Sequence, residues 1–411
     1  MSIGCADSVA RRCLAKAFTR AQAAQSRGDT KPVRLPLNPK QCPEFFATRD
    51  LDAARQFRAE ISAAERSGAI RLVPAKRMAP PNDVKAIIVS DLNILAARLG
   101  LDVRSNLVAQ GREQLSPYLE MFPVLDEVLA RWGLGKVVRG SGPTADAVSA
   151  LLDAIKVRLE RQSRSDEVLL RRASSHLFGN SKRIEALSRW LDLLAEGSLM
   201  PSGLTQHEVL SALGLHKEPQ PFLIGATAVA HNGQSESRLF RPYHGLPMTA
   251  ITGFQFDATP ACVVTVENLA TFHEMAALAK DTEVCVIYTG GMPSPAWRET
   301  YAKLLSSIAD NVPLYHFGDL DVGGFRIANV VANVASCFGC TLQPWLMDPS
   351  LIIKLGYKLN PATPAQVAAM AALCGQLGWH DIAEAIKCEP GLLEQEHISP
   401  HILGKQVISY S

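Results

Sequence analysis

Three acidic residues follow apolar, strand-like runs in the last third of the sequence. Glu267 comes directly after the run 262–266, and Asp319 and Asp321 come just after the run 312–317. In an open parallel sheet, ligands bind at the carboxyl ends of the strands, so these three side chains are expected to converge. Alternate residues of an extended segment point to one side, which lets both aspartates face one ion. Because Mg²⁺ prefers carboxylate and phosphate oxygens, the pattern predicts a Mg²⁺ or Mn²⁺ site that acts on a phosphodiester.

The elements around these acids predict a parallel α/β sheet flanked by helices. Four short apolar runs alternate with helix-like stretches, and the runs are 262–266, 284–289, 312–317 and 341–347. Strands that alternate with helices form parallel sheets with right-handed crossovers. Gly323 and Gly324 open the helix after the third run, and a helix N-terminus of this kind favours a phosphate.

The acids could instead have local structural roles. Acidic residues are favoured at helix starts, so Glu267 and Asp321 could each cap the helix that follows. The full pattern, Asp-x-Asp-x-Gly-Gly after one strand and Glu after an earlier one, favours the metal site. In that interpretation Asp319 and Asp321 hold the ion against the scissile phosphate. Glu267 either completes the metal shell or moves a proton.

Charge is distributed unevenly along the chain, although the net charge is only +2. Residues 1–110 carry 18 basic and 10 acidic side chains, residues 111–260 carry 16 of each, and residues 261–411 carry 8 and 14. A basic segment can hold a polyanion by neutralising phosphates, whereas ordinary variation between domains would give the same counts.

The basic segment has the element order of a winged helix. An amphipathic helix over 50–66 precedes strand-like runs at 69–73 and 84–89, and the loop between these runs contains Lys76 and Arg77. A basic wing contacts the DNA backbone. A plain hairpin with a solvated tip would show the same pattern.

The middle of the chain is predicted to be helical over 120–197. Lys182 and Arg183 are expected to contact DNA phosphates or a partner. A capping box at 205–208 opens a short helix that Gly214 ends, and a second helix from Lys217 would complete a helix-turn-helix. In the acidic region, Arg326 either grips a phosphate or pairs with a carboxylate.

Composition indicates a cytoplasmic, multidomain protein. No apolar run is long enough to cross a membrane, and the nine scattered cysteines suit a reducing compartment. The predicted division is a basic winged-helix-like arm at 1–110, a helical and winged-helix DNA-binding region at 111–250, and a catalytic domain at 251–411.

Several longer strings resemble one known family. Strand–Glu followed by strand–Asp-x-Asp is the signature of the Toprim fold. The chain is similar to the JetD nuclease subunits of Wadjet plasmid-defence systems at 177–183, 241–247, 266–272, 287–291, 315–327 and 393–396.

The resemblance implies a Toprim domain preceded by winged-helix segments, in a homodimer related to topoisomerase VI. It also implies double-stranded plasmid DNA as substrate. Recruitment by an SMC-like motor with kleisin, accessory and ATPase subunits follows from the same resemblance.

Two other functions remain open. A topoisomerase VI-like transesterase would attack DNA through a tyrosine, and neither Tyr118 nor Tyr243 has a clear place for that role. A DNA-binding adaptor would use its acids only structurally and would never cut. A tyrosyl–DNA adduct would identify the first, and the absence of metal-dependent nicking would identify the second.

Reversing the charge of the predicted wing tests whether the basic arm contacts DNA. The double variant Lys76→Glu/Arg77→Glu is expected to bind all duplex sequences more weakly. Its log affinity should also depend less steeply on log salt concentration, by about two phosphate contacts. Fluorescence anisotropy across a salt series measures this slope. An unchanged slope would show that the loop does not contact DNA.

Overall fold

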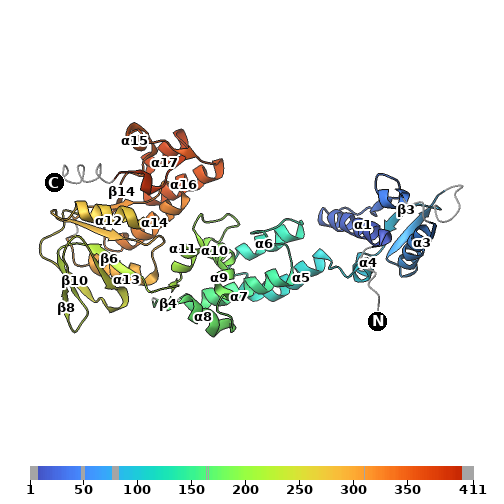
Figure 1. Ribbon diagram of the computed structural model, residues 1–411, viewed down its shortest axis with the longest axis horizontal. Coiled ribbons are helices and arrows are strands. Elements are labelled where there is room, and N and C mark those ends of the chain that lie inside the picture. Colours follow the sequence, from blue (N-terminus) through green and yellow to red (C-terminus); the bar gives the residue numbers. More distant parts are fainter. Residues whose placement is uncertain are drawn as a thin grey trace. The chain divides into compact units, whose positions relative to one another are not determined.

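The computed structural model describes residues 8–47, 51–75, 83–162, 164, 166–309 and 311–399 (Figure 1). The predicted wing residues Lys76 and Arg77 lie outside these ranges. The chain divides into two compact units, Met1–Leu152 and Asp153–Ser411, and the boundary falls within helix α7, Ala145–Arg161.

The first unit begins with an α+β arrangement around a small antiparallel sheet. Its elements are α1 Val9–Ser26, β1 Arg34–Pro36, α2 Pro43–Ala47, α3 Leu51–Arg66, β2 Ile70–Pro74 and β3 Val84–Val89. The strand order is β1-β3-β2. Leu35, Ile61 and Ile87 lie fully buried in the shared core because the helices cover one face of the sheet. The predicted helix and both predicted strands are confirmed.

Helices complete the first unit and begin the second. They are α4 Leu92–Leu99, α5 Arg104–Leu115, η1 Ser116–Tyr118, α6 Val124–Gly133, α8 Leu170–Phe178, α9 Arg183–Ala186, α10 Ser188–Glu196 and α11 Gln206–Ser211. The helical region predicted at 120–197 is therefore confirmed. The capping box is also confirmed, since Thr205 and Glu208 bond reciprocally at the start of α11.

The predicted helix-turn-helix is wrong. After Gly214, which has a φ of +68°, the chain forms β5 Leu215–His216 and then β6 Pro221–Gly225. β5 pairs in parallel with β4 Val168–Leu169. A second helix cannot start here because Pro219 and Pro221 supply no backbone N–H and disfavour helical geometry before them.

A six-stranded sheet in the second unit carries the predicted α/β pattern. Its order is β14-β13-β11-β12-β6-β9. The parallel strands are β11 Cys262–Val266, β12 Val284–Tyr288, β13 Leu314–Phe317 and β14 Leu342–Pro344. The four predicted apolar runs are all strands, so the mostly parallel α/β sheet is confirmed.

Three helices connect the parallel strands. They are α12 Leu269–Leu278, α13 Pro295–Leu305 and α14 Val322–Ser336. Right-handed crossovers place α12 on one face of the sheet and both α13 and α14 on the other, because the β12-to-β13 connection runs back across β11. α13 and α14 accordingly lie against each other.

Residues 221–256 are rich in strands that the sequence did not predict. β6 and β9, His244–Pro247, extend the central sheet in antiparallel fashion. The strands β7 Ala228–His231, β8 Glu236–Arg238 and β10 Gly253–Phe256 form a separate sheet, and the short helix η2 Met248–Ala250 connects β9 to β10 along the chain. The central sheet thus uses residues before 251, while the three-part division at 1–110, 111–250 and 251–411 stays a prediction.

The C-terminal segment packs beside α14. It contains α15 Pro349–Lys354, β15 Asn360–Pro361, α16 Pro364–Leu377, α17 His380–Cys388, β16 Gly391–Leu392 and η3 Gln395–His397. Asn329 of α14 donates a hydrogen bond to the Leu373 carbonyl of α16. A membrane-crossing helix, long and apolar enough for that role, does not occur in the described ranges.

Truncating a core side chain of the first unit tests whether this unit unfolds independently of the second. Ile87→Ala is expected to lower the free energy of unfolding by about 2–5 kcal/mol, because it leaves a cavity between the sheet and its helices. Calorimetry should show a lowered transition for the first unit and an unchanged one for the second. A single transition that shifts as a whole would contradict independent cores.

Candidate active site at the ends of the central strands

The sheet register brings Glu267 and Asp319 together. Val266 at the end of β11 pairs with Phe317 at the end of β13, so the residues that follow leave the sheet side by side. The Asp319 backbone N–H donates a hydrogen bond of 3.1 Å to Glu267 Oε2. The Glu267 N–H donates to the Phe317 carbonyl at 3.1 Å. The two strand ends are therefore locked to each other through these acids.

Asp321 occupies the N-cap of α14. Its Oδ1 accepts a hydrogen bond of 2.7 Å from the Gly324 N–H, so the capping role considered for Asp321 is confirmed. The same role is wrong for Glu267, because Asn268 caps α12 with bonds from Ala270 and Thr271. The Glu267 carboxylate therefore has no capping role in α12.

Burial and mutual repulsion disfavour the ionised acids. Burial raises the pKa of Glu267 well above its usual value, and the charge of Asp319 raises it further, although the Asp319 N–H opposes the shift. Burial likewise raises the pKa of Asp319 to about 6, against a hydrogen bond from Gln395. Charge on Asp321 adds to both shifts. Uncompensated negative charge is therefore costly in this cluster, and a proton or a cation would relieve the repulsion.

Two glycines permit the close packing around the acids. A Cβ on Gly318 would lie 2.8 Å from both Glu267 Oε2 and His316 Nε2. A Cβ on Gly324 would lie 2.1 Å from the Asp319 carbonyl oxygen. Any larger residue at either position would displace an acid. Gly324 is thus required because the Asp319 backbone approaches it closely, in addition to the phosphate-binding role that the sequence suggests for it.

His316 lies fully buried beneath the acids. Its Nδ1 is 2.9 Å from Thr265 Oγ1, and its Nε2 has no hydrogen-bond partner within the described ranges. Burial lowers the pKa of His316 to about 3, so the ring is neutral at physiological pH. It is a packed strand residue of β13.

Gln395 is a positioning residue that the sequence analysis missed. Its backbone N–H donates to Asp319 Oδ1 at 2.6 Å, and its side chain donates to the Phe317 carbonyl at 2.7 Å. The side-chain oxygen accepts from the Asn268 N–H at 2.7 Å. A bridge between Leu320 and Leu393 holds this segment in place. Only the resemblance at 393–396 marked the segment in the sequence.

Further carboxylates surround the pair. Glu394 raises the pKa of Asp319 through its charge, and Glu208 on α11 raises the pKa of both Glu267 and Asp319. Glu208 lies against the turn after β12, since a Cβ on Gly291 would be 3.0 Å from its Oε1. The capping box predicted the helix start but gave no sign that this glutamate faces the acids.

Two of the basic residues predicted to bind DNA, Arg183 and Arg326, form ion pairs with carboxylates of this chain. Arg326 forms an ion pair with Glu196 and donates to the Ser202 carbonyl at 2.6 Å, which agrees with the carboxylate alternative. Arg183 pairs with Asp153 at 2.7 Å, and Lys182 is exposed. A DNA-binding role for these three residues stays a prediction.

The three carboxylates are the kind of ligand that a hard divalent cation prefers. Glu267, Asp319 and Asp321 offer only carboxylate oxygens, which Mg²⁺ and Mn²⁺ prefer. Burial and the charge of neighbouring carboxylates raise the pKa values of Glu267 and Asp319, and a cation would offset both costs. Among the residues that the structure describes, no group of three or more His, Cys, Asp or Glu side chains is arranged so that it could hold a metal ion, so the fit is one of ligand chemistry.

Comparison with known proteins connects this site to one family. Residues 215–406 match the family model described as the C-terminal part of the Wadjet protein JetD. Over these residues the chain is similar to the JetD family. The match includes the parallel strands, Glu267, both aspartates and Gln395.

A curated relative supports the similarity to the JetD family. The Wadjet protein JetD of Bacillus cereus is 27% identical over 145 residues. The aligned stretch covers 34% of this chain and 34% of that relative. Its name associates the JetD family with Wadjet systems.

The raised pKa values predict how stability depends on pH. The Asp319 carboxyl has a pKa of about 6 in the fold against 3.8 ordinarily. The folded state therefore binds more protons between these values, and stability should fall as pH rises from about 4 to 6. With a chelator present, Asp319→Asn should show a smaller fall in melting temperature over this window than the wild type. Identical profiles would contradict the assigned repulsion.

Proposed function

We propose that this chain is the metal-dependent DNA endonuclease subunit of a Wadjet-type plasmid-defence complex. The observation that carries the proposal is the hydrogen-bonded pair of Glu267 and Asp319 at adjacent strand ends, with Asp321 beside it. Similarity to the JetD family supports the Wadjet assignment. Strand–Glu followed by strand–Asp-x-Asp in a parallel sheet supports a Toprim-type domain.

The acids would divide the chemistry among them. Glu267, Asp319 and Asp321 would hold Mg²⁺ or Mn²⁺, which when bound neutralises phosphate charge and acidifies a water molecule. Glu267 can move a proton at neutral pH because its pKa is raised. Asp319 and Asp321 are held in position by the N–H groups of Gln395 and Gly324.

The proposal extends to the substrate and the partner proteins. Double-stranded plasmid DNA is the substrate, a homodimer is the working form, and an SMC-like motor with kleisin, accessory and ATPase subunits delivers the DNA. These statements rest on the JetD family, and the aligned stretch spans about a third of the curated relative. The basic balance of residues 1–110 supports DNA binding by that segment.

A tyrosine beside the acids makes the transesterase alternative testable. Tyr288 ends β12, and the charge of Glu267 acts on its phenol. Burial and that charge raise the pKa of Tyr288, which disfavours the phenoxide that would attack DNA. Hydrolysis is therefore the favoured reaction.

Replacing the acids should separate catalysis from folding. Asp319→Ala, Asp321→Asn and Glu267→Gln are each expected to lower plasmid cleavage in Mn²⁺ by at least about a hundredfold. Asp321→Asn retains a side-chain oxygen for the α14 cap, so the helix start should survive. Gel assays of supercoiled plasmid measure the rate.

Controls make the result specific. Glu274→Gln changes an exposed glutamate on α12 and should leave the rate unchanged. Melting temperatures of the acid variants should equal or exceed that of the wild type, since each substitution relieves repulsion. Wild-type rates in all three variants would exclude the acids from catalysis. A covalent protein–DNA product in denaturing gels, lost in Tyr288→Phe, would instead establish transesterification.

A further inference from the structure

A groove in the second unit lies on the side of α13 and α14, next to the end of α7. Its volume is about 760 Å³, within the roughly 300–1,000 Å³ typical of ligand clefts. Arg158 of α7 and Arg298 of α13 line this groove together with apolar side chains of α14.

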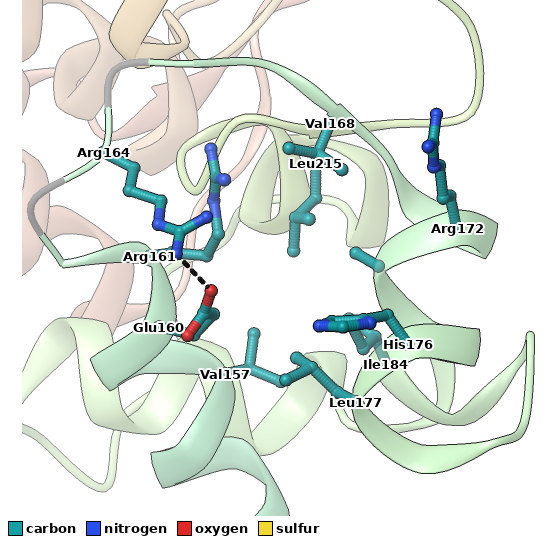
Figure 2. A pocket seen from close by; sticks show the side chains of 11 residues that line it. Val157, Glu160, Arg161, Arg164, Val168, Arg172, His176, Leu177, Ile184 and Leu215 are labelled. Carbon is teal, nitrogen blue, oxygen red and sulfur yellow. Dashed lines mark ion pairs between the residues drawn. The ribbon is translucent and has the colours of Figure 1, made fainter.

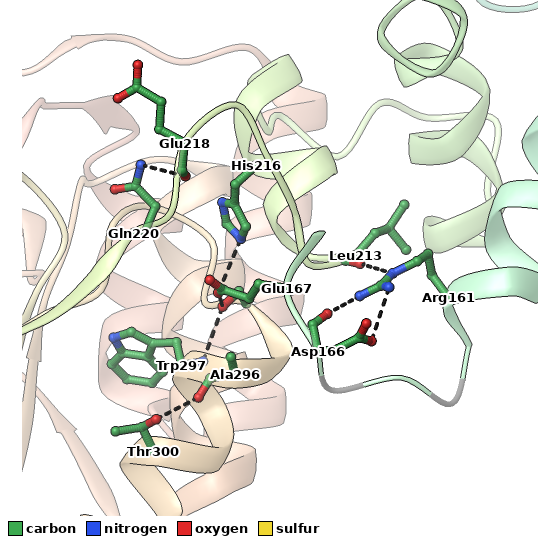
Figure 3. Close-up of polar contacts among 11 residues, drawn as sticks. Arg161, Asp166, Glu167, Leu213, His216, Glu218, Gln220, Ala296, Trp297 and Thr300 are labelled. Atoms are coloured by element: carbon green, nitrogen blue, oxygen red, sulfur yellow. Dashed lines mark hydrogen bonds and ion pairs between the residues drawn. The ribbon is translucent and has the colours of Figure 1, made fainter. Parts of the chain in front are cut away.

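Polar contacts fix the α7 end of this groove (Figure 3). Arg161 Nε donates to the Leu213 carbonyl at 2.9 Å. In the following loop, Glu167 accepts a hydrogen bond of 2.6 Å from Ser294, the N-cap of α13, and lies 3.3 Å from the His216 ring. The wall that carries Arg158 is therefore attached to the first turn of α13.

Two of the arginines at the groove are neutralised and two are not. Arg161 pairs with Asp166. Arg164 pairs with Glu160 at the rim of a smaller pocket of about 200 Å³ (Figure 2).

Arg158 and Arg298 have no carboxylate partner within the ranges that the structure describes. Burial lowers the pKa of both guanidinium groups, and Arg298 Nε is buried without an acceptor. A half-buried charge without a partner is costly, and a bidentate carboxylate would compensate it.

The α14 side of the groove is an apolar stripe. Val330 and Val334, four residues apart on one face of α14, line it together with Phe338, which follows the end of the helix. Such a stripe beside a second helix fits the apolar face of an inserted helix. DNA would use the arginines but would leave this stripe uncovered, since its affinity comes mainly from phosphate contacts.

We propose that this groove docks an acidic amphipathic helix of a partner protein. Its carboxylates would meet Arg158 and Arg298, and its apolar face would cover the α14 stripe. Val330 lies eight residues beyond Val322 at the start of α14, hence about 12 Å along the helix from the acid cluster. Docking would therefore leave the proposed cleavage site open to DNA.

Binding of a designed peptide to the full chain tests the proposal. The probe is a fluorescein-labelled helix of about 18 residues with a Leu face and a Glu face. Arg158→Gln/Arg298→Gln should weaken its affinity at least about tenfold. Asn333→Glu, an exposed change within the groove, should weaken it similarly by repelling the Glu face. Arg171→Gln, which removes an exposed guanidinium on α8 outside the groove, is the matched control and should bind as the wild type does.

Duplex DNA binding and plasmid cleavage should be unchanged in all three variants, so failure of this proposal is distinct from failure of the nuclease assignment. Equal loss of DNA and peptide binding would make the groove part of a DNA path. Peptide affinity that is unaffected by the groove variants, or weaker than about 1 mM in the wild type, would also overturn the docking proposal.

Discussion

Repulsion among buried carboxylates is the constraint around which the second unit is organised. Glu267 and Asp319 are brought together by the β11–β13 register, and burial and their proximity raise both pKa values. The fold offsets this cost with directed N–H groups from Asp319, Gln395 and Gly324. Carboxyl groups with perturbed pKa values of this kind gather at functional sites.

The sequence was sufficient to predict the four parallel strands of the central sheet and the pair of acids at its edge. Apolar runs of five to seven residues between helix-like stretches define parallel strands, and parallel strands bring their carboxyl ends to one edge. Predictions from local sequence patterns failed where contacts between distant segments determine the secondary structure. The short helix α11 already ends at Ser211, before Gly214. Pro219 and Pro221 then disfavour a second helix, and the segment forms strands that pair with distant partners. Periodicity alone cannot reveal those partners.

The residues missed around the site share one property. Glu208 and Gln395 act on the acids from other elements, and the charge of Glu267 acts on Tyr288. The local patterns of all three residues have complete explanations without a site. Glu208 completes a capping box, and Tyr288 ends an apolar strand. Spatial convergence of separate segments leaves no periodic trace in a sequence, so a site is predicted best where several members follow the same strand ends.

Gln395 shows how a remote segment can control the acids. One side chain connects the Asn268 N–H after β11 with the Phe317 carbonyl of β13, while its backbone binds Asp319. An amide suits this position because it donates and accepts at once, whereas a glutamate would only accept and would add charge beside Asp319. Movement of the C-terminal segment would therefore change the separation of the strand ends and the charge on Asp319 together. The geometry of the acids depends on that segment as much as on the sheet.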